Sequence, residues 1–241
     1  MMISKGINDI SIDVPKDAYD TGKDAPTFNA YLTVIVRDSE GRVIKVHRQR
    51  SHSPTTNFLG ILLPIIYFTN TGSSYKLTNI GGGTCSYMAN PPTGTSTVNI
   101  SYPSNNSTGN YPTYLVMIQV GSGSQSNPAS ATSLASPIAN GSGSGKLVYG
   151  AISLPSNIIV SSNSAYFYVS QTYSNLSGGT ITITEVGLVI QLQLETTYNN
   201  GATGNNINCG QLLVWYDVLS SSISVPNGGS VTIYYTFTVN P

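Results

Sequence analysis

Charge is the property that this sequence has least of: charged residues make up 8% of its 241 residues, against about 25% in an average protein. Ten basic and ten acidic residues give a formal net charge of zero, so the positive excess that nucleic-acid binders carry is absent. Ala, Leu, Glu and Lys are also too few to supply the faces of a helical bundle. These shortages exclude a helical bundle, and specific nucleic acid is not an expected partner.

Residues that bind metals are equally scarce. His47 and His52 are the only histidines, and Cys85 and Cys209 are the only cysteines, with no CxxC spacing. A zinc site needs several such ligands converging on one point, so no metal and no other cofactor is expected. The two cysteines either pair as one disulfide that closes a long loop or remain two buried thiols, and the sequence favours neither.

Catalytic patterns are missing as well. No G-x-S-x-G precedes a helix, and beyond residue 50 the only acidic residues are Glu185, Glu195 and Asp217. We expect Glu185, inside the hydrophobic stretch ITITEVGLV, to form a buried pair with Lys146 or an N-terminal arginine, and Asp217 to cap a turn. We therefore predict no enzyme and no catalytic residue, since a glycoside hydrolase would need these carboxylates to line one cleft.

Long hydrophobic runs are limited to residues 58–68, FLGILLPIIYF, which is about half the length that spans a bilayer. Residues 53–57 offer an N-cap just before this run, so we predict a short buried helix. The alternative is a plug that faces a membrane or a partner, but membrane contact through 58–68 is not predicted. The first residues, MMISKGINDISIDV, have no apolar segment and no small-residue cleavage site, so we expect no secretory signal.

Uncharged polar residues are what the chain has in abundance: Ser, Thr, Asn and Gly make up 104 of its residues, while 39% are hydrophobic. The hydrophobic residues lie in short alternating stretches between polar turns, the pattern of antiparallel strands. Strands are expected at 31–37, 42–50, 75–80, 95–101, 113–120, 146–153, 157–160, 165–173, 180–194, 211–218 and 231–239. The predicted fold class is all-β: an antiparallel β-sandwich of jelly-roll type with an N-terminal hairpin, one short helix and long Gly/Ser/Asn-rich loops.

Two parts are expected along the chain. Residues 1–28, with five aspartates and two prolines, form an extended N-terminal arm. Residues 29–241 form a single sandwich domain, in which 29–68 are the hairpin and the short helix and 121–145 are a long loop. In the alternative interpretation that loop is a domain linker, but its segment 133–138, SLASPI, is apolar enough to pack back onto a sheet.

The few charges are unevenly spread, since residues 1–50 hold eight of the ten basic and seven of the ten acidic residues. The basic residues of the expected hairpin are the candidates for contact with other subunits: Arg42, Lys45, His47, Arg48 and Arg50. The alternative is that they are solvated surface charges. The remaining body is coated with groups that do not titrate below about pH 10, so we expect it to keep its charge state in acid.

Two features of the sequence are relevant to sugars: glycosylation sequons and tyrosines. Asn-X-Ser/Thr sequons are candidate glycosylation sites, and they occur at Asn99, Asn105, Asn106, Asn140 and Asn175. Sixteen tyrosines are available as sugar-binding platforms, although most are expected to pack on sheet faces.

Three stretches share a layout of strand, turn and strand: YLTVIVRDSEGRVIKVHRQRSHSPTTNFLGIL, YFYVSQTYSNLSGGTITITEVGLVI and LLVWYDVLSSSISVPNGGSVTIYYTFTV. This layout resembles structural proteins of tailed phages, proviruses and archaeal viruses, and the Ile/Tyr/Asn/Ser-rich style is similar to viruses of hot, acidic-spring archaea. The resemblance implies a thermophile's virion component, such as a jelly-roll capsid, turret or spike subunit. Its partners would be copies of itself and other virion proteins.

The composition, rich in uncharged polar residues, suits a protein exposed outside the cell, yet no export signal is expected. Both observations are consistent with a virion component. A virion protein is assembled in the host cytoplasm and leaves the cell with the particle, so it needs no signal peptide. The alternative function is a receptor- or glycan-binding adhesin module, with a host-surface glycan as its partner.

Overall fold

The computed structural model describes residues 27–51, 53–66, 74–88, 97–101, 116–161, 164–197 and 207–240. Within these ranges the protein is mostly β, with one α-helix, and every pair of named strands is antiparallel. The prediction of an all-β protein with one short helix is confirmed. The elements are β1 (Thr27–Arg37), β2 (Val43–Ser51), α1 (Thr56–Ile66), β3 (Ser74–Thr78), β4 (Thr84–Met88), β5 (Thr97–Ser101), β6 (Val116–Gly121), a 3₁₀ turn (Pro128–Ser130), β7 (Val148–Ser153), β8 (Ile159–Ser161), β9 (Ser164–Ser174), β10 (Ile181–Thr197), β11 (Ile207–Val225) and β12 (Ser230–Asn240).

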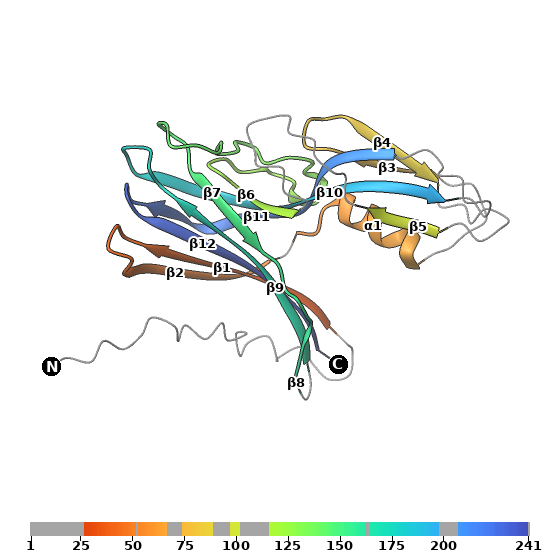
Figure 1. Ribbon diagram of the computed structural model, residues 1–241, viewed down its shortest axis with the longest axis horizontal. Coiled ribbons are helices and arrows are strands. Elements are labelled where there is room, and N and C mark those ends of the chain that lie inside the picture. The colour runs from red at the N-terminus through yellow and green to blue at the C-terminus, as the bar shows by residue number, and fades with distance from the viewer. Residues whose placement is uncertain are drawn as a thin grey trace.

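Two main sheets pack on each other as in a sandwich (Figure 1). Sheet A has the order β2-β1-β12-β9, and the outer edge of β9 is shared by β7 and β8. Sheet B is built on the long pair β10–β11, and β6 and β5 share the other edge of β10. After β10 and β11 have formed sheet B, β12 returns to lie beside β9 in sheet A, which is a Greek-key return.

The core lies between the two sheets, because alternate residues of each strand face inward. In β1 these residues are Leu32, Val34 and Val36, and they belong to the same buried cluster as Ile183 and Val186 of β10. The hairpin β1–β2 and the strand β12 follow the alternating patterns that predicted them. Sheet A is therefore a layer whose inner face is apolar, and it depends on sheet B for cover.

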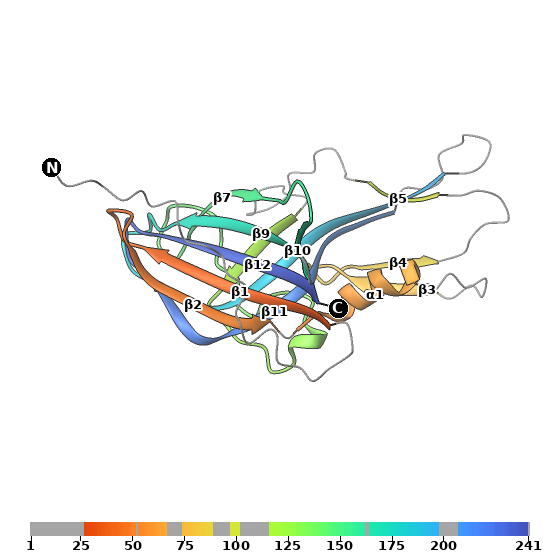
Figure 2. The ribbon, with the colours of Figure 1, turned by 90° about the horizontal axis from the view of Figure 1, so that it is seen from below.

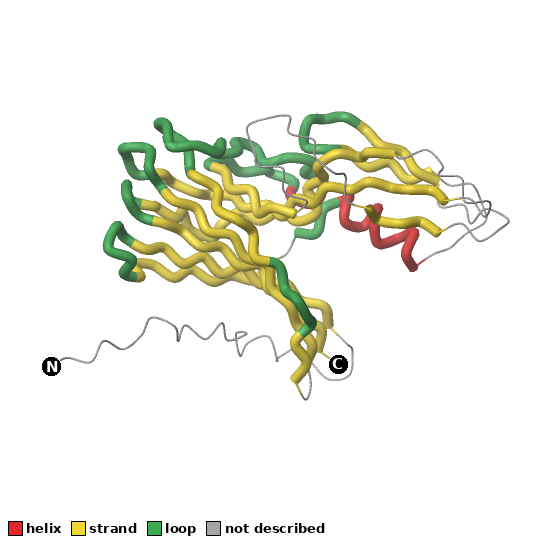
Figure 3. Tube along the Cα trace, viewed as in Figure 1, coloured by secondary structure: helices red, strands yellow, loops and turns green. Residues whose placement is uncertain are grey.

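Strands extend beyond the sandwich at two places, and different elements extend at each. At one end β10 and β11 run on beyond the sandwich, where α1, β3, β4 and β5 lie near them (Figures 1 and 2). A disulfide between Cys85 of β4 and Cys209 of β11 joins the pieces there. Near the C-terminus, the strands β1, β12, β9 and β8 of sheet A run past sheet B (Figure 3).

Helix α1 begins where the sequence offers an N-cap. Thr55, the residue before it, is buried and donates its hydroxyl to the carbonyl of Leu213 at 2.7 Å. Phe58 and Ile61 pack against the core, while Leu59 faces outward. The helix is thus partly buried, and across the described ranges no helix has both the length and the apolar character to cross a membrane.

The long loop 121–145 packs against sheet B. Leu134 and Ala131 lie with Met117, Val189 and Leu213 in a second buried cluster. This cluster forms on the outer face of sheet B, so the loop acts as a cover for that face.

Candidate functional site

The basic residues of β2 alternate between two surroundings. Lys45 and His47 face β11: Lys45 Nζ donates to the carbonyl of Ser222 at 2.8 Å, and His47 Nδ1 lies 3.3 Å from the hydroxyl of Ser221. Arg48 and Arg50 are exposed on the opposite face. The alternation expected for a strand is therefore present, and it separates the basic residues into two groups.

Arg42 lies in the turn between β1 and β2 and contacts acidic residues of the same turn. Its Nε is 2.7 Å from Asp38 Oδ2, and its Nη1 is 2.9 Å from Glu40 Oε2. The hydrogen bond from Arg42 lowers the pKa of the Asp38 carboxyl below its usual value. The five candidate subunit-contact residues therefore do not form one patch, and two of them, Arg48 and Arg50, are exposed without an ion pair among the described residues.

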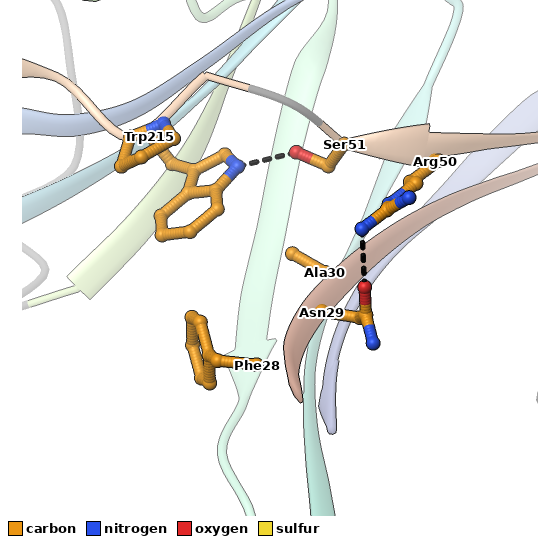
Figure 4. Close-up of a pocket in the computed structure, with 7 residues that line it drawn as sticks. Phe28, Asn29, Ala30, Arg50, Ser51 and Trp215 are labelled. Carbon is orange, nitrogen blue, oxygen red and sulfur yellow. Dashed lines mark hydrogen bonds between the residues drawn. The ribbon is translucent and has the colours of Figure 1, made fainter. Parts of the chain in front are cut away.

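A hollow of about 180 Å³ lies beside Arg50, where β2 ends (Figure 4). Its lining comes from β1, β2, the segment leading to α1, and β11: Phe28, Asn29, Ala30, Arg50, Ser51, Pro54 and Trp215. Arg50 Nη2 donates to Asn29 Oδ1 at 2.5 Å, which holds the guanidinium at the rim. The hollow thus combines an exposed cation with an aromatic wall.

The aromatic wall is part of a cluster around Trp215. The indole centroid lies 5.2 Å from the ring of Phe237 and 6.2 Å from the ring of Phe28, both in edge-to-face geometry. The ring of Phe58 of α1 lies 5.3 Å from the indole, also in edge-to-face geometry. We did not predict this site from the sequence, although Trp215 is the only tryptophan in the chain, which is a signal that could have indicated it.

A buried hydrogen-bond network fixes the base of the hollow. Trp215 Nε1 donates to Ser51 Oγ, Ser51 donates to Asp217 Oδ2 at 2.5 Å, and Tyr235 donates to the same oxygen at 2.9 Å. Burial, followed by the nearby Asp217 carboxylate, raises the pKa of the Tyr235 hydroxyl well above its usual value. The prediction that Asp217 caps a turn is wrong, because Asp217 lies within β11 and links three strands.

Glu185 is buried, as expected, but its partners differ from those predicted. Its carboxylate accepts backbone N–H groups of Gly123, Ala135 and Ser136 at 3.1, 2.9 and 2.7 Å, and the Tyr216 hydroxyl at 2.7 Å. Lys146 is exposed and takes no part, because neutral donors already satisfy the charge. A Cβ on Gly123 would lie 2.9 Å from the carboxylate, so this close approach requires glycine.

The two buried carboxylates point to opposite faces of sheet B. In the register of β10 and β11, Glu185 is opposite Val218, and Asp217 is opposite its neighbour Val186. Adjacent positions alternate in direction, so Glu185 faces the loop and Asp217 faces sheet A. They do not form the convergent pair that glycoside hydrolysis needs, and in the described part of the chain no three His, Cys, Asp or Glu residues are grouped as metal ligands.

The sequons lie in different settings. Asn175 is buried, and its Nδ2 donates to the carbonyls of Gly179 and Val225, both at 2.8 Å. This amide has no room for a glycan, so the structure argues against glycosylation at Asn175. Asn140 is half-buried and accepts the N–H of Tyr149; the side chain of Asn99, together with Asn105 and Asn106, lies outside the described residues, so those sites stay predictions.

Comparison of the chain with protein-family models, with curated proteins and with solved structures finds no match in any of the three.

Proposed function

We propose that this chain is a non-enzymatic structural subunit of a virus particle, a capsid, turret or spike protein that assembles through its N-terminal region. The arrangement of charge on the sandwich is the observation that carries this proposal. Outside β1, β2 and their turn, Lys76 and Lys146 are the only charged residues among the described side chains that reach the surface, because Glu185 and Asp217 are buried.

A neutral polar body favours close packing of many identical copies. Like-charged subunits repel one another, and this surface has little charge with which to do so. Contacts between copies would then depend on apolar burial and hydrogen bonds rather than on electrostatic steering. The exposed cations Arg48 and Arg50 lie on the N-terminal hairpin, where the proposal places the contacts.

The proposal includes the jelly-roll form of the sandwich. The first and last strands, β1 and β12, are neighbours in sheet A, and β12 reaches its place beside β9 by a Greek-key return. Jelly rolls contain two Greek keys, and the described strands support one of them.

A direct test has two parts. Mass spectrometry of purified source particles should find this chain as a stoichiometric component. In solution, the full-length chain should form large assemblies that a chain beginning at residue 27 does not form, and light scattering would measure the difference. The truncation leaves β1 intact, so assembly that proceeds equally well without residues 1–26 would contradict the proposed role of the N-terminal region.

An adhesin is the second candidate, and one observation favours it. Tyr168 and Tyr234 lie half-buried on the outer face of sheet A, with ring centroids 6.1 Å apart. A tyrosine offers an apolar ring face together with a polar hydroxyl, a combination that suits a sugar ligand. Binding of the isolated protein to a glycan array, lost on Tyr168→Ala but not on Tyr166→Ala, would favour this function over a purely structural one.

A further inference from the structure

One row of apolar residues crosses sheet A at the end where it runs past sheet B. The register places Phe28 of β1 opposite Val239 of β12, Val239 opposite Ala165 of β9, and Ala165 opposite Val160 of β8. Directly paired residues share a face of the sheet. We name these four residues the apolar ledge. Phe28, Val239 and Val160 are 52%, 46% and 76% exposed.

The ledge is a continuation of the inner face of the sandwich. Two residues further along the same strands, Ala30 and Phe237 are 2% and 6% exposed. The ring of Trp215 lies 5.2 Å from that of Phe237 and 6.2 Å from that of Phe28, so the cover from β11 ends at the edge of the ledge. Figure 1 shows the ends of β1, β12, β9 and β8 continuing beyond sheet B. From that edge onward, the ledge is an apolar sheet face on which the second layer is missing.

We propose that the second layer over the ledge is residues 9–14 of the N-terminal arm of a second copy of this chain. This inference rests on the proposed function, because it names the partner and the contact through which the subunits assemble.

The sequence of residues 9–14, DISIDV, has the pattern of a segment with one apolar side. Ile10, Ile12 and Val14 alternate with Asp9, Ser11 and Asp13. In an extended chain, Ile10 and Val14 lie about 13 Å apart, and four neighbouring strands span about 14 Å. The apolar side of the segment thus matches the width of the ledge from Phe28 to Val160.

The position of the arm favours a second copy over the same copy. The arm of each chain joins the sandwich at Thr27, in the ledge region itself. Pro15 and Pro26 bias the residues before them toward extended backbone, and twelve residues separate Val14 from Thr27. A stretch of that length spans at most about 40 Å when extended, which is long enough for residues 9–14 to reach the ledge of a neighbouring copy.

Mixed disulfide cross-linking tests the proposal, because Cys85 and Cys209 are already joined to each other and an added cysteine is the only free thiol. Full-length Ile12→Cys and full-length Val160→Cys are purified separately, mixed and mildly oxidised. The expected result is a covalent dimer that contains both variants. Since each chain carries one added cysteine, this product can form only between two copies.

The matched control replaces Val160→Cys by Leu176→Cys. Leu176 is also exposed, but it lies after β9 at the opposite end of that strand from Ala165. This control should give no mixed dimer above background. Equal yields in the two mixtures would overturn the proposal, and so would the absence of mixed dimer in both.

Three other occupants give distinct results, each of which would also overturn the proposal. A disulfide within the double variant Ile12→Cys/Val160→Cys, without mixed dimers, would assign the ledge to the chain's own arm. Val160→Cys homodimers that form just as well from chains lacking residues 1–26 would indicate that two ledges face each other. Binding to phosphatidylcholine vesicles that Val160→Asp abolishes would assign the ledge to a lipid surface.

If mixed dimers form but purified particles do not contain this chain, only the proposed function is rejected. If the particles contain the chain but no mixed dimer forms, only this inference is rejected.

Discussion

The covered and uncovered parts of sheet A's inner face are made of the same strands and the same kinds of residue, yet they end in different environments. Ala30 and Phe237 are almost completely buried, whereas Phe28 and Val239, two positions away, are about half exposed. Trp215 of sheet B lies 5.2 Å from Phe237 and 6.2 Å from Phe28, so the cover from sheet B ends between the two rows. Burial here is decided by whether a second layer is available, and the uncovered part is where the protein can take that layer from a partner.

Replacing one phenylalanine in each part should give the largest contrast. Phe237→Ala removes a buried ring that stacks with Phe28, Phe167 and Tyr235, so the free energy of unfolding should fall by about 3–5 kcal/mol. Phe28→Ala should cost the isolated subunit about 1 kcal/mol, because half of that ring is already in water. Urea denaturation measures both values. Similar losses for the two variants would mean that the ledge is not uncovered.

Removing the disulfide should affect the other end of the molecule. Cys85 and Cys209 are separated by 124 residues, and a bond that closes so long a loop stabilises by about 2–4 kcal/mol. The double variant Cys85→Ser/Cys209→Ser should therefore unfold at lower urea and show faster amide exchange in β3 and β4. Cross-linking at the ledge should be unchanged when Ile12→Cys and Val160→Cys are placed in this background, and its loss would show that the two ends are coupled.

Sheet B has its own covered face, which depends on Glu185. Glu185→Gln replaces an acceptor oxygen by an NH₂ group that opposes the loop's N–H donors, so we expect a loss of about 2–3 kcal/mol. Amide exchange should accelerate at Gly123, Ala135 and Ser136. Tyr216→Phe, which removes one donor to the same carboxylate, should cost about 1 kcal/mol; the reverse order of effects would contradict the assigned role of Glu185.

The smallest effect is expected at the β1–β2 turn in acid. The hydrogen bond from Arg42 lowers the pKa of Asp38 in the folded state, so the ionised carboxylate stabilises the fold above its unfolded-state pKa. This contribution is lost as the pH falls through the lowered folded value. Arg42→Gln should raise the Asp38 pKa in an NMR titration while hardly changing stability at neutral pH, because the pair is exposed. An unchanged Asp38 pKa would show that Arg42 is not the cause.

Alternation predicted most of the strands correctly, since β1, β2, β9, β10 and β12 have clear two-residue periods. The errors lie where tertiary contacts outweigh local pattern. The strand expected at 211–218 is longer in the structure. β11 continues to Val225, where Gln49 accepts the N–H of Ser220 and Lys45 donates to the carbonyl of Ser222. β4 was missed; it forms by pairing with β3 and is joined to β11 by the disulfide between Cys85 and Cys209.

The candidate site was less predictable than the fold. The sequence indicated which residues are basic, but the hollow forms from β1, β2 and β11, whose contacts depend on how the sheets pack. Glu185 illustrates the same limit: its burial could be predicted from the hydrophobic stretch around it. Its partners could not, because they are backbone N–H groups of a loop about fifty to sixty residues away.

The most direct test of the central claim is an electron-microscopy map of the source particle at a resolution that allows the sandwich to be placed. The account predicts that this chain occupies a repeated position, and that the row formed by Phe28, Val239, Ala165 and Val160 lies under density from a neighbouring copy. A map in which that row faces open solvent in every copy, or a particle that does not contain this chain, would contradict it.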